Sequence, residues 1–294
     1  MNQVEVLMNR VAGTENAFDS LRNVKDDRHF VLLDLHSHHR ERRRHALRTA
    51  RSRHWIDSYG DVRVRALLVD AIENGSLEEF ERALTLNGRD HTVVLMDVGG
   101  YILVTSERRA DVPIEEWVHS LTPPGVQVTA IGSAALRSEE DDLMRAIDEA
   151  RTTAEIVLQL GDTLPSNRAE DLGAWRLLHA IGGDPELIIS ASPAANELWR
   201  SDPMRRLTVE TYLDSGCNVA SACSTLHIHR TTLYYRLESM PEIVREALGD
   251  GLKRSTLHLA LKLLRLWNGA AVPAAAAPAE SRRESPAVLG RAAV

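Results

Sequence analysis

The segment from Leu207 to Met240 constrains the fold of this chain most, because it predicts three short helices separated by tight turns. Gly216 predicts the end of the first helix, since glycine readily takes the left-handed conformation common at that position. Asn218 is a favourable N-cap for the second helix, and Pro241 stands just beyond the third. Apolar side chains recur at helical spacing through all three helices, which predicts a compact all-α domain. The positions that predict its buried side are Leu207, Tyr212, Leu213, Val219, Ala222, Cys223, Leu226, Leu233, Leu237 and Met240.

The third of these helices carries polar side chains opposite its apolar face. In a helix-turn-helix, the N-terminal residues of such a helix point at base edges, while other residues contact phosphates. Arginine can pair with guanine, and threonine and tyrosine hydroxyls can reach bases or phosphate oxygens. An ordinary helical hairpin with a polar outer face is the alternative. The DNA-contacting residues predicted here are His229, Arg230, Thr231, Thr232, Tyr235 and Arg236.

The same segment resembles the C-terminal helix-turn-helix of PucR/CdaR-family bacterial transcriptional regulators. A closing helix at 252–266 extends the likeness. The resemblance implies a sequence-specific DNA-binding regulator, controlling metabolic genes in response to a small-molecule effector. The residues that carry it are Gly216, Asn218, Ala222, Leu226, Ile228, His229, Arg230, Thr232, Leu233, Tyr235, Arg236 and Leu237.

Residues 62–165 resemble, more faintly, the GGDEF-like central domain of that family. Residues 62–88 resemble its helical entry, and two apolar strands are predicted to join at Gly99–Gly100. A further strand is expected to turn near Gly132 and to lead into a long helix at 138–160. The fold class expected is therefore α+β: a helix-rich chain with a degenerate GGDEF-like α/β domain followed by an all-α helix-turn-helix domain. The inward positions expected of the long helix are Leu143, Ala146, Ile147, Ala150, Ala154 and Val157.

This likeness does not extend to catalysis. A diguanylate cyclase needs an acidic pair after the glycines of its hairpin, and none follows Gly100 here. The chain also has no Walker-type phosphate loop and no GxGxxG. We therefore expect a ligand-sensing or dimerising platform that is not an enzyme, with no catalytic residues, no metal and no cofactor.

Composition agrees with a modular regulator. A length of 294 residues suggests about two domains, and no apolar run is long enough to cross a bilayer. The N-terminus has no signal-peptide core, so a cytoplasmic location is expected. The net charge of −7 argues against indiscriminate nucleic-acid binding but leaves room for a specific site, because phosphate neutralisation is local. The two cysteines, Cys217 and Cys223, do not suggest a disulfide framework.

The N-terminal region holds a competing signal. Residues 30–35 predict a strand, which would place His36 and His38 at its end. Two imidazoles at this spacing can converge on a divalent metal, with help from Asp34 or His39, as in amidohydrolase and PHP-type barrels, which this motif resembles. A metal-dependent hydrolase is therefore a rival, although the chain lacks the repeated βα pattern of such barrels.

A basic run follows this motif. Between Arg28 and Arg65 the chain has ten arginines and four acidic residues. Such a run usually makes a solvated helix face. An auxiliary DNA-phosphate contact and an intramolecular partner for the acidic central domain are the alternatives.

The sequence thus predicts a regulator that binds double-stranded operator DNA as a homodimer or higher oligomer, because one helix reads only a few base pairs. A protein-interaction scaffold that has lost DNA binding is the other rival. Five segments are expected: a short basic N-terminal segment at 1–60, a GGDEF-like regulatory or dimerisation domain at 61–165, a helical connector at 166–200, a PucR-type helix-turn-helix DNA-binding domain at 201–268, and a disordered Ala/Pro-rich tail at 269–294.

Overall fold

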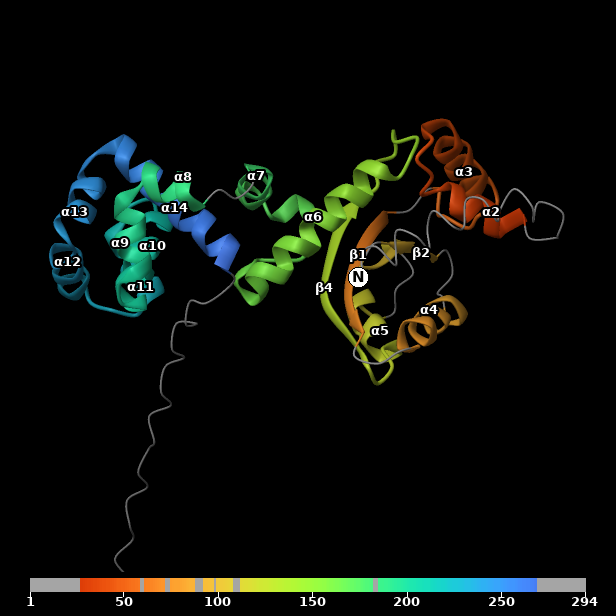
Figure 1. Ribbon diagram of the computed structural model, residues 1–294, viewed down its shortest axis with the longest axis horizontal. Coiled ribbons are helices and arrows are strands. Elements are labelled where there is room, and N and C mark those ends of the chain that lie inside the picture. Colours follow the sequence, from red (N-terminus) through yellow and green to blue (C-terminus); the bar gives the residue numbers. More distant parts are fainter. Residues whose placement is uncertain are drawn as a thin grey trace, which may run out of the picture. The chain divides into compact units, whose positions relative to one another are not determined.

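The computed structural model describes residues 27–58, 61–71, 75–87, 92–97, 99–107, 112–181 and 185–268. The described residues form two compact units (Figure 1), one from residues 27–181 with 265–268 and the other from residues 185–264. The tail predicted to be disordered, 269–294, lies outside the described residues, as does the start of the predicted basic segment.

The first unit is built on one antiparallel sheet with the strand order β2-β3-β1-β4. One helix joins β1 to β2 and another joins β3 to β4, so the chain follows a split β-α-β-β-α-β path. The predicted α+β class is confirmed, whereas the likeness to a GGDEF-like domain stays a prediction. The elements of this path are β1 (Val62–Ala71), α4 (Ser76–Leu86), β2 (Val93–Asp97), β3 (Gly100–Ser106), α5 (Ile114–Leu121) and β4 (Val126–Ala135).

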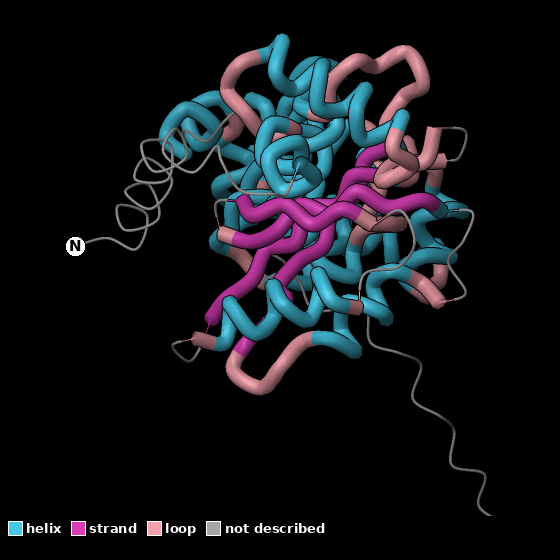
Figure 2. Tube along the Cα trace, turned by 90° about the vertical axis from the view of Figure 1, so that its right-hand side faces the viewer, coloured by secondary structure: helices cyan, strands magenta, loops and turns pink. Residues whose placement is uncertain are grey.

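Helices cover both faces of this sheet (Figure 2). One face packs on α3 (Arg40–Ser52) and α6 (Met144–Leu160), and β1 contributes Val64 to that core. The other face packs on α4 and α5, and β1 contributes Leu67 to it. Successive strand residues point to opposite faces, so both sets of side chains along β1 become buried.

Two predicted elements were wrong. Residues predicted as a strand before His36 form the helix α2 (Asp27–Asp34), because a short apolar run cannot be assigned by its periodicity alone. Conversely, residues 62–71, which resembled a helical entry, form the strand β1. Its alternating valines and arginines are buried on both faces, so the usual contrast between a polar and an apolar side is lost.

The predicted connection between two strands at Gly99–Gly100 is confirmed, although only Gly99 lies between β2 and β3, and Gly100 is the first residue of β3. Gly99 has φ +76°, a conformation that costs glycine little, and Asp97 pairs directly with Gly100 across the hairpin. This confirms the tight connection between the two strands.

Gly132 occupies a different place from the predicted turn, because it lies within β4. A Cβ at this position would stand 2.1 Å from the backbone nitrogen of Ala154 and 2.4 Å from the carbonyl oxygen of Ala150, both on α6. The glycine therefore lets the helix approach the strand. The helix itself begins at Met144 and not at 138, and its predicted inward residues are buried or half-buried in the core.

The basic helix α3 faces an acidic loop that precedes α6. Arg43 pairs with Asp142 at 3.1 Å, and Arg44 pairs with Asp141. Arg51 donates to the carbonyl oxygen of Glu140 at 3.2 Å. One alternative raised by the sequence, an intramolecular partner for the acidic central domain, is therefore confirmed for this face of the basic run.

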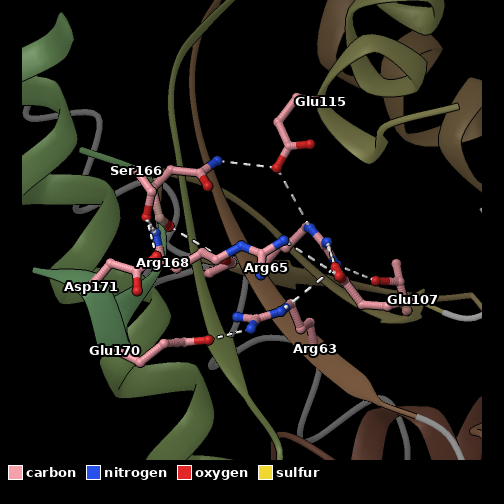
Figure 3. Close-up of polar contacts among 11 residues, drawn as sticks. Arg63, Arg65, Glu107, Glu115, Ser166, Arg168, Glu170 and Asp171 are labelled. Carbon is pink, nitrogen blue, oxygen red and sulfur yellow. Dashed lines mark hydrogen bonds and ion pairs between the residues drawn. The ribbon is translucent and has the colours of Figure 1, made fainter. Parts of the chain in front are cut away.

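Buried arginines of β1 make ion pairs with the residue after β3 and with the segment that leaves the sheet (Figure 3). Arg65 pairs with Glu107, and Arg63 pairs with Glu170 in the short 3-10 helix η3 (Ala169–Asp171). The N–H of Ser133 also donates to the carbonyl oxygen of Asn167 at 2.8 Å, so this segment runs beside the edge strand β4. These contacts fix the chain at the exit from the sheet.

The second unit consists of helices. None of the described helices in either unit is long and apolar enough to span a bilayer. Both cysteines lie in this unit as free thiols. A further helix, α7 (Ala174–Ile181), ends the first unit, after the short 3-10 helix η2 (Gly161–Thr163) and η3. The helices that follow are α8 (Pro185–Ala191), α9 (Pro193–Arg200), α10 (Pro203–Asp214), α11 (Val219–Leu226), α12 (Arg230–Glu238), α13 (Glu242–Gly249) and α14 (Gly251–Asn268).

Candidate nucleic-acid interface

The turn between α10 and α11 has the predicted form. Gly216 and Cys217 both adopt positive φ, +61° and +63°, and the N–H of Cys217 donates to the carbonyl oxygen of Tyr212 at 2.9 Å. Asn218 then caps α11, because its side-chain oxygen accepts from the N–H of Ser221 at 3.0 Å. The glycine and asparagine thus set where the two helices end and begin.

A second tight turn joins α11 to α12. His227 is left-handed with φ +53°, and the N–H of Ile228 donates to the carbonyl oxygen of Cys223 at 3.1 Å. Ala222 is fully buried, which agrees with its predicted place in the packed interior of this domain. The predicted third helix is confirmed, with its first residue at Arg230.

His229 acts as the N-cap of α12. Its Nδ1 accepts from the N–H of Thr231 at 3.4 Å and lies 2.9 Å from the Thr231 hydroxyl oxygen. An imidazole nitrogen that accepts carries no proton, so in the neutral ring the proton is on Nε2. The cap therefore leaves an exposed Nε2–H donor at the start of the helix.

The outer face of α12 is defined by four side chains at helical spacing: Thr231, Tyr234, Tyr235 and Glu238. The opposite side carries the fully buried Leu233. Tyr235 is 73% exposed and Tyr234 is 50% exposed, so both phenols are available to a partner. We call these four residues, with the exposed Arg230 at the helix start, the outer face.

Thr232 and Arg236 lie on the flank of α12 and not on its outer face. Both are half-buried, and Arg236 Nη1 donates to the hydroxyl of Thr208 on α10 at 3.3 Å. The six residues predicted to contact DNA thus divide into an N-cap, an exposed group and a flank. None of these contacts is tested by the free chain, so all six stay predictions.

Sequence reasoning missed Tyr234. Its neighbour Tyr235 was chosen, yet Tyr234 is the residue three positions after Thr231 and four after Arg230. A helical-wheel count from Arg230 places it on the exposed side, so the spacing itself held the missing signal. Which side of α12 is exposed depends on the residue at which the helix begins, Arg230.

A polar clamp holds α14 against α10, the helix that supports the turn. Lys262 Nζ lies 2.9 Å from Glu210 and 2.7 Å from Asp214, and His258 Nε2 lies 2.7 Å from Asp214. Burial by itself raises the pKa of Asp214, but the bonds from His258 and Lys262 outweigh it, so that pKa lies below its ordinary value. Charge therefore contributes to the rigidity of this support.

One histidine of the rival metal motif, His36, makes other contacts. Arg151 makes two bonds to the carboxylate of Asp97, at 2.7 and 2.6 Å, and its Nη2 also donates to His36 Nε2 at 2.9 Å. A guanidinium only donates, so this imidazole nitrogen accepts and the ring is neutral. Burial lowers the pKa of His36, although the charge of Asp97 acts in the opposite direction. Among the described residues, no group of three His, Cys, Asp or Glu side chains could hold a metal.

Comparison with known proteins places this helical segment in a family. Residues 206–263 match the model of the PucR C-terminal helix-turn-helix domain. The purine catabolism regulatory protein of Bacillus subtilis (strain 168) is 36% identical over 59 residues. That alignment covers 20% of this chain and only 11% of the Bacillus protein, so the likeness concerns this domain alone.

A solved structure also resembles the chain, but weakly. The regulator of polyketide synthase expression from Bifidobacterium adolescentis aligns with 81% of this chain and 98% of its own, at 18% identity and a TM-score of 0.32. No argument rests on a likeness of that size. The local match is specific: this chain carries a PucR C-terminal helix-turn-helix domain at residues 206–263.

Proposed function

We propose that this chain is a transcriptional regulator that binds specific DNA sequences through the outer face of α12. The observation that carries the proposal is the exposed set Arg230, Thr231, Tyr234 and Tyr235 on a short helix that two tight turns and a buried leucine hold in place. The match of residues 206–263 to a regulator's DNA-binding domain supports the same reading. Arginine and hydroxyl groups on such a helix suit base edges and phosphates in the major groove.

We assign base contacts to the start of the helix. Arg230 is exposed at the first helical position, and within the described part of the chain its guanidinium has no hydrogen-bond partner. Thr231 follows on the outer face, and His229 offers its free Nε2–H beside it. In this arrangement Arg230 pairs with a guanine, while the hydroxyls of Tyr234 and Tyr235 reach bases or backbone.

The protein acts as a homodimer or higher oligomer in this proposal. One short helix spans only a few base pairs, so two heads on half-sites separated by whole helical turns are needed to select an operator. The first unit then serves as the platform that pairs the heads and takes a small-molecule effector. The regulated genes are metabolic, as the family resemblance of the sequence suggests.

A selection experiment tests the proposal. The full chain is incubated with fragmented genomic DNA of its own organism, and the bound fragments are sequenced. The proposal expects one enriched motif, built from two half-sites. Failure to enrich any sequence would contradict it and favour the rival scaffold that has lost DNA binding.

A pair of variants then tests the contact assignment. Arg230→Ala should weaken binding to the enriched sequence by about tenfold or more, because one bidentate base contact contributes about 1–3 kcal/mol. Arg200→Ala on α9 removes the same charge from an exposed position outside the helix-turn-helix and should leave affinity almost unchanged. Equal losses in the two variants would show that charge alone, and not base contact, explains the effect.

A further inference from the structure

A hollow of about 240 Å³ lies beside the helix-turn-helix, between the first turn of α10 and the last turn of α12. Two guanidinium side chains, Arg205 and Arg236, line it together with the hydroxyl-bearing Thr208 and Ser239. The volume is far above the ~10–15 Å³ that one water molecule needs. The hollow is therefore large enough for a tetrahedral anion.

The charge of the hollow is positive. Arg205 is exposed, and within the described residues its guanidinium has no hydrogen-bond or ion-pair partner, while the guanidinium of Arg236 makes only the 3.3 Å bond to Thr208. Asp202 also lines the hollow, but its carboxylate already accepts from the N–H of Met204 at 3.0 Å as the N-cap of α10. The two guanidinium groups and the one carboxylate together give the hollow a net positive charge, which favours an anion.

The position of the hollow indicates which anion it meets. An α-helix with its side chains is about 10–12 Å across, and the major groove of B-DNA is about 12 Å wide. A recognition helix therefore fills the groove, and its flanks face the phosphates on the two rims. In the DNA complex proposed above, the flank of α12 that carries Arg236, and the hollow that extends from it onto α10, would lie toward one of these rims.

Resting on the DNA binding proposed above, we infer that this hollow receives one phosphate of the DNA backbone. Arg205 and Arg236 donate to the phosphate oxygens. The role of Arg236 is then distinct from that of Arg230: it fixes the position of the head on the backbone and carries no sequence information.

Salt dependence of DNA binding tests this assignment in the full chain. Each phosphate neutralised contributes about 0.9 to the slope of log affinity against log salt. Arg205→Ala and Arg236→Ala should each reduce the slope by up to about 0.9, which is about a fivefold loss at 0.15 M salt. The loss should be equal for the enriched sequence and for a scrambled one. Lys253→Ala, which removes one charge from an exposed position on α14 outside the hollow, should leave the slope unchanged.

A conservative variant separates phosphate contact from base reading. Arg236→Lys keeps the charge and can still bind a phosphate, but it cannot make the bidentate pair with guanine. We expect Arg236→Lys to keep both the slope and the preference for the enriched sequence. Loss of that preference with an unchanged slope would overturn the inference. Circular dichroism melting of each variant shows whether a lost affinity comes from lost folding.

A titration with inorganic phosphate tests whether the hollow binds a free anion instead of DNA. Calorimetric titration of phosphate into the native chain without DNA should show no saturable binding that Arg205→Ala removes. Such binding, together with unchanged DNA salt slopes, would assign the hollow to a free anion and overturn the inference. A native chain that binds no DNA would overturn the proposed function, whereas DNA binding with unchanged slopes in both alanine variants would overturn this inference alone.

Discussion

His229 shows how a single side chain can hold two roles that sequence alone does not separate. The sequence marked it for DNA contact, and the structure uses its Nδ1 to cap α12. Histidine is not among the most common N-caps, so no propensity rule points to this bond. The sequence also could not show that Arg230 is exposed at the helix start while Arg236 is half-buried on its flank. That difference depends on which side of α12 packs against α10.

Tyr101 gives a prediction about pH at the residue scale. Burial against α4, followed by the charges of Glu81 and Glu78, raises the pKa of Tyr101 to about 12, and its hydroxyl donates to the carbonyl oxygen of Leu77 at 2.9 Å. A raised pKa in the folded state means that this phenol stabilises the fold fully below about pH 10, and that the contribution is lost as pH rises through 12.

Ultraviolet titration of the native chain and of Tyr101→Phe measures this directly. The difference between the two curves should contain one tyrosine that ionises near pH 12, while the unfolded chain shows none above the ordinary range. A difference curve centred near pH 10 in the folded chain would contradict the burial argument.

At the scale of elements, the sequence predicted helices and strands that bury one face, but not the strand that is buried on both faces. The inward side of α6 followed from helical spacing, and the hairpin followed from Gly99–Gly100. β1 was missed because its two faces meet two helical layers, and α2 was missed because six apolar-rich residues do not reveal a period.

Gly132 gives a stability prediction for the contact between β4 and α6. Gly132→Ala places a Cβ 2.1 Å from the backbone of Ala154, which cannot move without shifting the helix. We expect a loss of about 1–3 kcal/mol, or more, in the free energy of unfolding measured with urea. Gly249→Ala is the matched control: nothing lies within 4 Å of that Cβ position, so the change should stay within about 0.5 kcal/mol. Equal stability of the two variants would show that α6 does not lie this close to β4.

The clamp between α14 and α10 gives a second prediction at this scale. Lys262→Met leaves Glu210, whose side chain is only 3% exposed, without this cation. Losing the charged bonds that Lys262 makes to Glu210 and Asp214 should cost about 1.5–3 kcal/mol in chemical denaturation. Lys253→Met breaks an exposed contact with Glu246 at 3.9 Å and should cost less than about 1 kcal/mol. If the two lysines prove equivalent, the clamp does not support the helix-turn-helix as described.

At the scale of the whole molecule, the sequence predicted the amount of charge but not which charged segments pair with each other. The net charge of −7 and the basic run were evident from the sequence, but the pairing of that run with residues 140–142 depends on tertiary structure. The helix-turn-helix could be found because its turns rely on local signals, Gly216 and Asn218 above all. The first unit carries no comparable local motif, so the sequence did not indicate what this unit binds, if it is the platform proposed above.

The central claim is that the outer face of α12 reads DNA sequence. The most direct test is the ratio of the full chain's affinities for its enriched sequence and for a scrambled duplex, measured by fluorescence anisotropy at fixed salt. We predict a ratio of at least about 10³ for the native chain, as is usual for specific regulators. Arg230→Ala should lower that ratio by about tenfold or more. A native chain with equal affinity for both duplexes would contradict the account.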